Sequence, residues 1–172
     1  MFARTSRLML RPAWAEDARV LGNLLADAMI CRALWHPVDQ GDWVPQPSDP
    51  LLPSLLIFER TSGAPRLIGA CGLSRRASGA LVLKVWIDPA QRGRGFASEA
   101  CAALLEIAAT LGFRQIEAGH EADDPAAAAL LGKLGFRSTG LAALPSGKSS
   151  KRQVPTNLLR ARLCDKREAL AA

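Results

Sequence analysis

The sequence predicts an α/β (α+β) fold, in which one domain spanning residues 1–172 packs helices on the faces of a central sheet. Strand-like runs alternate with segments of helical periodicity along the chain. The length of 172 residues, 49% of them hydrophobic, suits one domain with a substantial core. The run 80–88, "ALVLKVWID", is nearly continuous apolar sequence, as in a strand buried on both faces. We expect a mixed, mostly antiparallel sheet of about six to seven strands, flanked by about four helices.

The first half of the chain begins with a strand, "RLMLRPA" (7–13), and a helix. Apolar residues after the strand recur at the spacing of one helix face, namely Val20, Leu21, Leu24, Leu25 and Ala28. Residues 36–53 hold five prolines, so we expect a long loop there, with at most a helical turn. Strands 54–60 and 66–76 follow, and the "TSGAP" between them favours a hairpin.

The second half of the chain contains two more helices. Residues 95–111 show helical periodicity, and Gly112 suits a C-terminal stop. Asp124 and Pro125 are typical of an N-cap and a first helical position, and this helix is expected to end at Gly135.

Three strands complete the expected sheet. A short strand, 114–120, lies between the two helices along the chain. The last two strands, 136–144 and 156–163, flank the polar loop 145–155. We find neither an internal repeat nor a linker that would divide the chain.

Composition narrows the possible partners. The net charge is +6, but aromatic residues make up only 5% and tyrosine is absent, so nucleic acid would find few stacking platforms. A small anionic ligand matches this charge better. No apolar run reaches the ~20 residues of a membrane span, and "MFARTSRLML" lacks the apolar core of a signal peptide. We therefore expect a cytoplasmic protein without nucleic-acid or membrane partners, and leave a homodimer open.

The cysteines do not suggest a metal centre. The four cysteines are far apart in the sequence and form no CxxC pair. Reduced, buried thiols are the better interpretation, and we expect no metal site.

The stretch "DPAQRGRGFASEA" (88–100) carries the strongest chemical signal. Gly93 and Gly95 let the backbone approach an anion closely, and the helix that follows presents unpaired amides at its N-terminus. Two arginines add positive charge. A plain basic turn is the alternative. A dinucleotide fingerprint lacks its third glycine here, and the GK[ST] ending of a nucleotide P-loop is absent.

The run Arg92-Gly-Arg-Gly95-Phe-Ala97 resembles the R/Q-x-x-G-x-G/A signature of the GCN5-related N-acetyltransferase (GNAT) family. "LMLRPAWAEDARVL", "VWIDPAQRGRGFASEA" and "AGHEADDPAAAALLGKLGFRSTG" are similar, in order, to segments of the subgroup that includes the ribosomal-protein alanine acetyltransferases. The resemblance covers roughly residues 5–165.

This resemblance implies that acetyl-CoA is the cosubstrate and that its acetyl group goes to a primary amine. The amine would be the α-amine of a protein N-terminus or a small-molecule amine. The alternative is a catalytically weakened, CoA-binding scaffold with a binding or sensing role. The implied cofactor-binding residues are Trp86, Ile87, Asp88, Arg92, Gly93, Arg94, Gly95, Phe96, Ala97, Ser98 and Asp124.

The catalytic groups are less clear, because tyrosine, a common family acid, is absent, and Ala127 replaces the relatives' serine. His120 is the first candidate base, and its alternative is a structural role beneath the last helix. Glu121 and Asp124 are further candidates, although Asp124 also suits a helix cap where relatives carry asparagine. Trp35 and Trp43 are candidate acceptor-side residues, and core packing is the alternative for Trp35.

Overall fold

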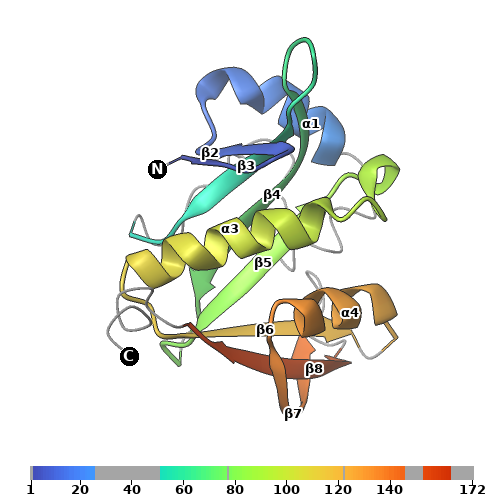
Figure 1. Cartoon of the computed structure of the whole chain (residues 1–172). Helices are drawn as coiled ribbons and strands as arrows, with labels where there is room; N and C mark the ends of the chain where they lie inside the picture. The colour runs from blue at the N-terminus through green and yellow to red at the C-terminus, as the bar shows by residue number, and fades with distance from the viewer. Residues whose placement is uncertain (1, 26–50, 77, 122, 146–152, 164–172) are drawn as a thin grey trace.

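The computed structural model describes residues 2–25, 51–76, 78–121, 123–145 and 153–163. Within them lie eight strands in one sheet, three α-helices and two 3-10 helices (Figure 1). The strands are β1 (Ala3–Arg4), β2 (Leu8–Arg11), β3 (Ser54–Glu59), β4 (Arg66–Arg75), β5 (Leu81–Ile87), β6 (Gln115–Glu121), β7 (Arg137–Pro145) and β8 (Gln153–Arg162). The helices are η1 (Ala15–Asp17), α1 (Ala18–Leu25), η2 (Pro89–Gln91), α3 (Phe96–Thr110) and α4 (Pro125–Lys133).

The sheet is mixed and mostly antiparallel, as predicted. Its strand order is β1-β2-β3-β4-β5-β6-β8-β7, and only the β5–β6 pair is parallel. The predicted hairpin between 54–60 and 66–76 is confirmed by β3 and β4. The sheet has one strand more than the upper expectation, because the two-residue β1 adds an edge strand.

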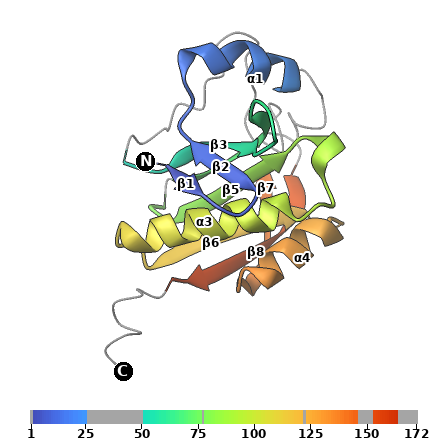
Figure 2. The same cartoon turned by 45° about the horizontal axis from the view of Figure 1, so that its top comes forward.

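Helices cover both faces of the sheet. α3 and α4 bury Leu104 and Leu131 in a core with Ile116 of β6, so these two helices share one face (Figures 1 and 2). α1 packs Leu21 against Leu56 and other residues on the opposite face. Complete burial of a leucine or isoleucine side chain stabilises the fold by about 1.5–3 kcal/mol.

A 3-10 turn precedes the first helix, and an ion pair fixes this turn. The turn, η1, is held by Asp17, whose carboxylate accepts hydrogen bonds from both terminal nitrogens of Arg11 at 2.7 Å and from the Trp14 amide. The hydrogen bonds from Arg11 hold the pKa of Asp17 below its usual value. Leu21 is fully buried, whereas the adjacent Val20 is 50% exposed. The prediction that Val20 lies on the buried face of the helix is therefore wrong.

The last two strands are longer than predicted. β7 extends to Pro145 and β8 begins at Gln153, so part of the predicted loop 145–155 is paired backbone. Pro155 pairs with Ala143 within this hairpin, although proline usually weakens a strand prediction. β8 also lies between β6 and β7, an order that the sequence pattern did not indicate.

The helices in the described part of the chain are too short or too polar to span a membrane. The buried Cys71 and Cys101 are free thiols, which agrees with the predicted state for these two cysteines. Burial raises the pKa of the Cys71 thiol well above its usual value and that of Cys101 to about 12, so both are unreactive.

Candidate functional site

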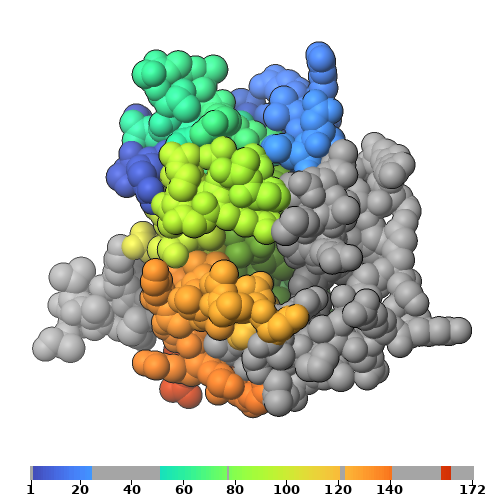
Figure 3. Space-filling view, turned by 90° about the vertical axis from the view of Figure 1, so that its right-hand side faces the viewer, coloured from blue at the N-terminus to red at the C-terminus, as the bar shows by residue number. Residues whose placement is uncertain are grey.

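The sheet opens between its two parallel strands. β5 and β6 pair at Val82 and Glu117, and no further pair joins them among the described residues, although β5 continues to Ile87 and β6 to Glu121. In Figure 1 the two strands diverge toward the end where α3 and α4 begin. Figure 3 views this side, where the lime residues before α3 and the orange α4 flank a recess with green atoms at its base.

Backbone amides of β5 point into this opening. The Asp88 amide donates to the carbonyl of Ile68 in β4, at 2.8 Å. Because successive backbone amides of a strand point to opposite sides, those of Val85 and Ile87 point away from β4 and toward the opening. Arg92 Nε donates to the Ile87 carbonyl at 3.2 Å, which places that carbonyl on the same side. The opening is therefore lined by peptide groups that β6 leaves unpaired.

A glycine turn connects β5 to α3. Asp88 accepts a hydrogen bond from the Ala90 amide and so begins the 3-10 turn η2, which has Pro89 at its first position. Gly93 and Gly95 then adopt left-handed backbone angles, with φ of 75° and 80°. This conformation strains any residue with a Cβ, so the glycines are needed for the turn itself.

The amides after this turn lie where the sequence predicts an anion-binding site. No described residue accepts a hydrogen bond from the backbone amides of 93–98, and the first helical bond of α3 is from Glu99 to Gly95. Such free amides at a helix N-terminus, together with the helix dipole, attract a negatively charged group. A Cβ on Gly93 would meet nothing within 4 Å, so the space above the turn is open.

Charged residues hold the turn from outside. Arg94 donates to Glu59 of β3 at 2.8 Å and to Gln91 at 2.6 Å. Arg7 donates from NH1 to the carbonyl of Arg94 at 2.9 Å. Both arginines also lie over the ring of Phe96, at 4.6 and 4.8 Å from its centroid. The predicted basic residues therefore position the backbone as well as supply charge.

Glu99 completes this support and was not among the predicted site residues. Its carboxylate accepts hydrogen bonds from the Arg7 amide at 3.0 Å, from Arg7 Nε at 2.8 Å and from the hydroxyl of Thr5. Burial alone would raise the pKa of Glu99, but these hydrogen bonds outweigh it and hold the pKa below its usual value. The partners lie more than 90 positions away in the sequence, which is why no local pattern revealed them.

The remaining predicted cofactor residues are divided between environments. Trp86 lies on the α1 face of the sheet and Ile87 on the α3 face, both buried. Phe96 is buried beneath the turn, while Ala97 and Ser98 are half-buried in the first turn of α3.

The structure describes the side chains of two of the three candidate catalytic residues, His120 and Asp124. His120 is 8% exposed, and alternation along β6 places it on the face covered by α3 and α4, with Ile116 and Ala118. Asp124 is the N-cap of α4, and its Oδ1 accepts from the Ala127 amide at 2.9 Å. The side chain of Glu121 lies outside the described structure, as do Trp35 and Trp43.

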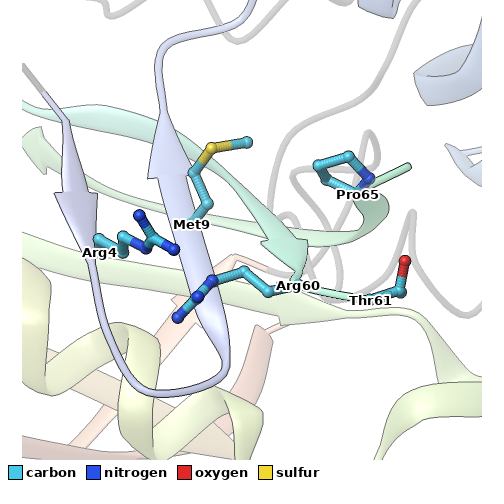
Figure 4. A pocket seen from close by; sticks show the side chains of 5 residues that line it. All are labelled: Arg4, Met9, Arg60, Thr61 and Pro65. Carbon is cyan, nitrogen blue, oxygen red and sulfur yellow. The ribbon is translucent and has the colours of Figure 1, made fainter. Parts of the chain in front are cut away.

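A second, shallow cavity lies near the β1–β2 edge of the sheet, away from the opening between β5 and β6. Its volume is about 320 Å³, and β1, β2 and the β3–β4 hairpin line it with Arg4, Met9, Arg60, Thr61 and Pro65 (Figure 4). Arg60 donates to the carbonyls of Thr5 and Ser6, so it supports the turn between β1 and β2. None of the predicted site residues lines this cavity. The described residues contain no cluster of side chains suited to a metal ion.

Comparisons with known proteins identify a family and a shared fold. A family model for the acetyltransferase (GNAT) domain matches residues 7–137. Comparison with curated protein sequences gives no match.

Solved structures share the fold at low sequence identity. A GNAT-family acetyltransferase from Bacillus anthracis has 15% identity and a TM-score of 0.73, covering 94% of this chain and 98% of its own. Spermidine N-acetyltransferase from Vibrio cholerae, in complex with CoA and spermine, has 18% identity and a TM-score of 0.71, with coverage of 94% and 98%.

A third structure is the Salmonella typhimurium acetyl transferase that modifies the N-terminal serine of ribosomal protein L7/L12, with 17% identity, a TM-score of 0.70, and coverage of 93% and 97%. The family model spans well over half of the chain, and the solved structures of acetyltransferases share its fold. The chain therefore belongs to the GNAT family of acetyltransferases.

Proposed function

We propose that this protein is an acetyl-CoA-dependent N-acetyltransferase whose transferase unit spans residues 1–172. The observation that carries this proposal is the set of free amides at 93–98, which lie beside the opening between β5 and β6. The turn would hold the diphosphate of CoA, and the cofactor's arm would then enter the opening along β5. Membership of the GNAT family supports this assignment.

The diphosphate would interact mainly with backbone groups. The amides of Gly93 to Ser98 supply donors, and Arg92 and Arg94 are exposed and add positive charge. Part of the hydrogen-bonding capacity of Arg94 is already used by Glu59 and Gln91, so its guanidinium is held in place before any ligand binds. A preorganised turn loses little conformational freedom on binding.

The thioester of acetyl-CoA supplies the acetyl group, and the protein would stabilise the negative charge that develops on its carbonyl oxygen. The Val85 and Ile87 amides, which point into the opening, are the donors available for this task. They are fixed by the pairing of β5 with β4, so they need no rearrangement during the reaction.

The preferred acceptor is a primary amine of low pKa. Freeing a lysine side chain of its proton at pH 7 costs about 4.6 kcal/mol, whereas freeing a peptide α-amine costs about 1.4 kcal/mol. His120 is buried on the α3/α4 face, and the Asp124 carboxylate accepts a hydrogen bond from the Ala127 amide, so we assign neither as a strong base. An acetyltransferase without a strong base would favour α-amines over lysine side chains.

The test combines binding and turnover. CoA binding is measured by calorimetry, and acetyl transfer by thiol release from acetyl-CoA with a panel of α-amines and lysine side-chain amines. We expect micromolar CoA binding and faster transfer to α-amines. Binding without turnover on any amine would support the weakened scaffold instead, and faster transfer to lysine side chains would reject the preference for α-amines.

A further inference from the structure

Lys84 is a cation near the point where β5 and β6 separate, and the proposed chemistry does not use it. It lies on β5 two residues after Val82, the residue paired with β6. Alternation along β5 places it on the same face as Val82 and Trp86, which is the α1 face. The CoA turn precedes α3, which covers the other face. Lys84 is thus placed on the side from which an acceptor could approach the opening.

Lys84 is partly buried by backbone on one side. Its partner across the β4–β5 ladder is Gly72, and a Cβ there would lie 3.0 Å from the carbonyl oxygen of Pro53. The backbone before β3 therefore passes close to Lys84 and fills the space over Gly72. On the other side of Lys84, β5 has no pair with β6 beyond Val82 among the described residues, so this side of the lysine faces the opening.

Positive charge exceeds negative charge around this space. Glu117 accepts from Arg160 at 2.6 Å and lies 3.9 Å from Arg76, so one described carboxylate is shared between two arginines. Lys84 donates no hydrogen bond to any described residue and forms no ion pair with one. Burial, and then the charge of Arg76, hold the pKa of Lys84 below its usual value.

We propose that Lys84, with Arg76, binds a carboxylate of the acceptor, so that the substrate is a small amine of the α-amino-acid type. This rests on the proposed acetyltransferase function and specifies its substrate class. A partly buried ammonium that has no partner among the described residues, together with the guanidinium of Arg76, is complementary to a compact anion. The same charges oppose polyamines, which carry two or more ammonium groups.

The pairing also has a consequence for reactivity. In a free amino acid the carboxylate stabilises the neighbouring ammonium and keeps its amine protonated. When Lys84 binds the carboxylate, that stabilisation weakens and the amine loses its proton more readily. The amine's lone pair then attacks the thioester carbonyl, the carbon–sulfur bond breaks, CoA leaves as its thiolate, and the proton lost by the amine passes through solvent to that thiolate.

The experiment compares pairs of acceptors that differ only in charge. Each pair is an L-amino acid and its C-terminal amide, with alanine, leucine, methionine and glutamate as the side chains. The α-amine of the amide compound is less basic than that of the free amino acid, so a larger fraction of it is unprotonated at neutral pH. Without recognition of the carboxylate, the amide compound should therefore react faster. We expect the opposite for this protein, with kcat/KM for the acid about tenfold higher or more. Equal or better transfer to the amides overturns the proposal.

Variants assign the preference to Lys84. Lys84→Met should lower the acid-to-amide ratio about tenfold or more, mainly through KM, and Lys84→Arg should keep most of it. Lys133→Met, at an exposed position in the last turn of α4, makes the same change in net charge and should leave the ratio unaltered. A ratio unchanged in Lys84→Met overturns the proposal.

Binding measurements separate this proposal from the proposed function. All variants should bind CoA within about threefold of the original protein, because Lys84 does not contact the turn at 93–98. The CoA-bound protein should also bind N-acetylmethionine more tightly than N-acetylmethioninamide, whatever the turnover. If CoA does not bind, the proposed function fails; if CoA binds and the two acetylated compounds bind equally, only the carboxylate site fails.

Discussion

At the residue scale, a comparison of Gly95 with Gly79 separates the effect of backbone strain from the effect on ligand binding. Both have φ angles in the left-handed region, 80° and 84°. An added Cβ would lie 3.5 Å from Arg7 at Gly95 and would meet nothing within 4 Å at Gly79. The two positions therefore carry the same conformational strain, about 1–2 kcal/mol for alanine. Only Gly95 belongs to the turn that we propose binds CoA.

We predict that Gly95→Ala and Gly79→Ala lower the free energy of unfolding by similar amounts, while only Gly95→Ala weakens CoA binding, by about tenfold or more. The added methyl group would hinder approach of the diphosphate to the amides. Urea denaturation gives the first quantity and calorimetry the second. Equal CoA affinity in the two variants would show that the turn does not contact the cofactor.

Glu99 makes the support of this turn dependent on pH. Because its pKa in the folded protein is lowered, its contribution to stability is present above the unfolded value of about 4.3 and is lost as pH falls through the folded value. We predict that Glu99→Gln lowers the free energy of unfolding by about 1–2 kcal/mol at pH 7. The deficit should shrink as pH falls through the lowered pKa of Glu99 in the folded protein, because the original carboxyl group then becomes protonated.

Urea denaturation at a series of pH values tests this, with the exposed Glu16→Gln as the control. A deficit that stays constant from pH 7 to pH 3 would mean that the Glu99 charge does not hold the turn.

At the element scale, β5 is positioned by close contact with β4. Gly69 faces Ile87 across the ladder, and a Cβ at Gly69 would lie 2.3 Å from the carbonyl oxygen of Trp86. Backbone atoms cannot rotate away as a side chain does, so β5 would have to move. The Val85 and Ile87 amides would then move with it.

We predict that Gly69→Ala lowers the free energy of unfolding by about 3 kcal/mol or more and weakens CoA binding in the protein that remains folded. Gly63→Ala is the control, because a Cβ there would lie 3.9 Å from the Thr61 hydroxyl, which is ordinary contact. Thermal denaturation and calorimetry measure the two effects. A Gly69→Ala protein as stable as Gly63→Ala would contradict the close packing of β4 against β5.

For the whole molecule, the sequence predicts features that are contiguous in the chain. The turn at 92–97, the capping of α4 by Asp124 and the β3–β4 hairpin each depend on neighbouring residues, and the structure contains all three. The predicted fold class and its mostly antiparallel sheet follow from the order of such segments.

Features that join distant segments were not predicted. The insertion of β8 between β6 and β7 depends on pairing across the sheet, and the contacts of Glu99 with the β1–β2 turn join residues more than 90 positions apart. Periodicity also does not tell on which face of β6 His120 lies, and the structure places it, buried, on the α3/α4 face. The proposed role of Lys84 likewise depends on its neighbours across the sheet, which the sequence pattern does not identify.

The central claim is that free amides at the start of α3 hold the diphosphate of CoA. The most direct measurement is calorimetric titration with CoA and with pantetheine, which shares the thiol arm but lacks the diphosphate. The account predicts micromolar binding of CoA, binding of pantetheine weaker by at least about a hundredfold, and loss of CoA binding in Gly95→Glu. Equal binding of the two compounds, or CoA binding unaffected by Gly95→Glu, would contradict it.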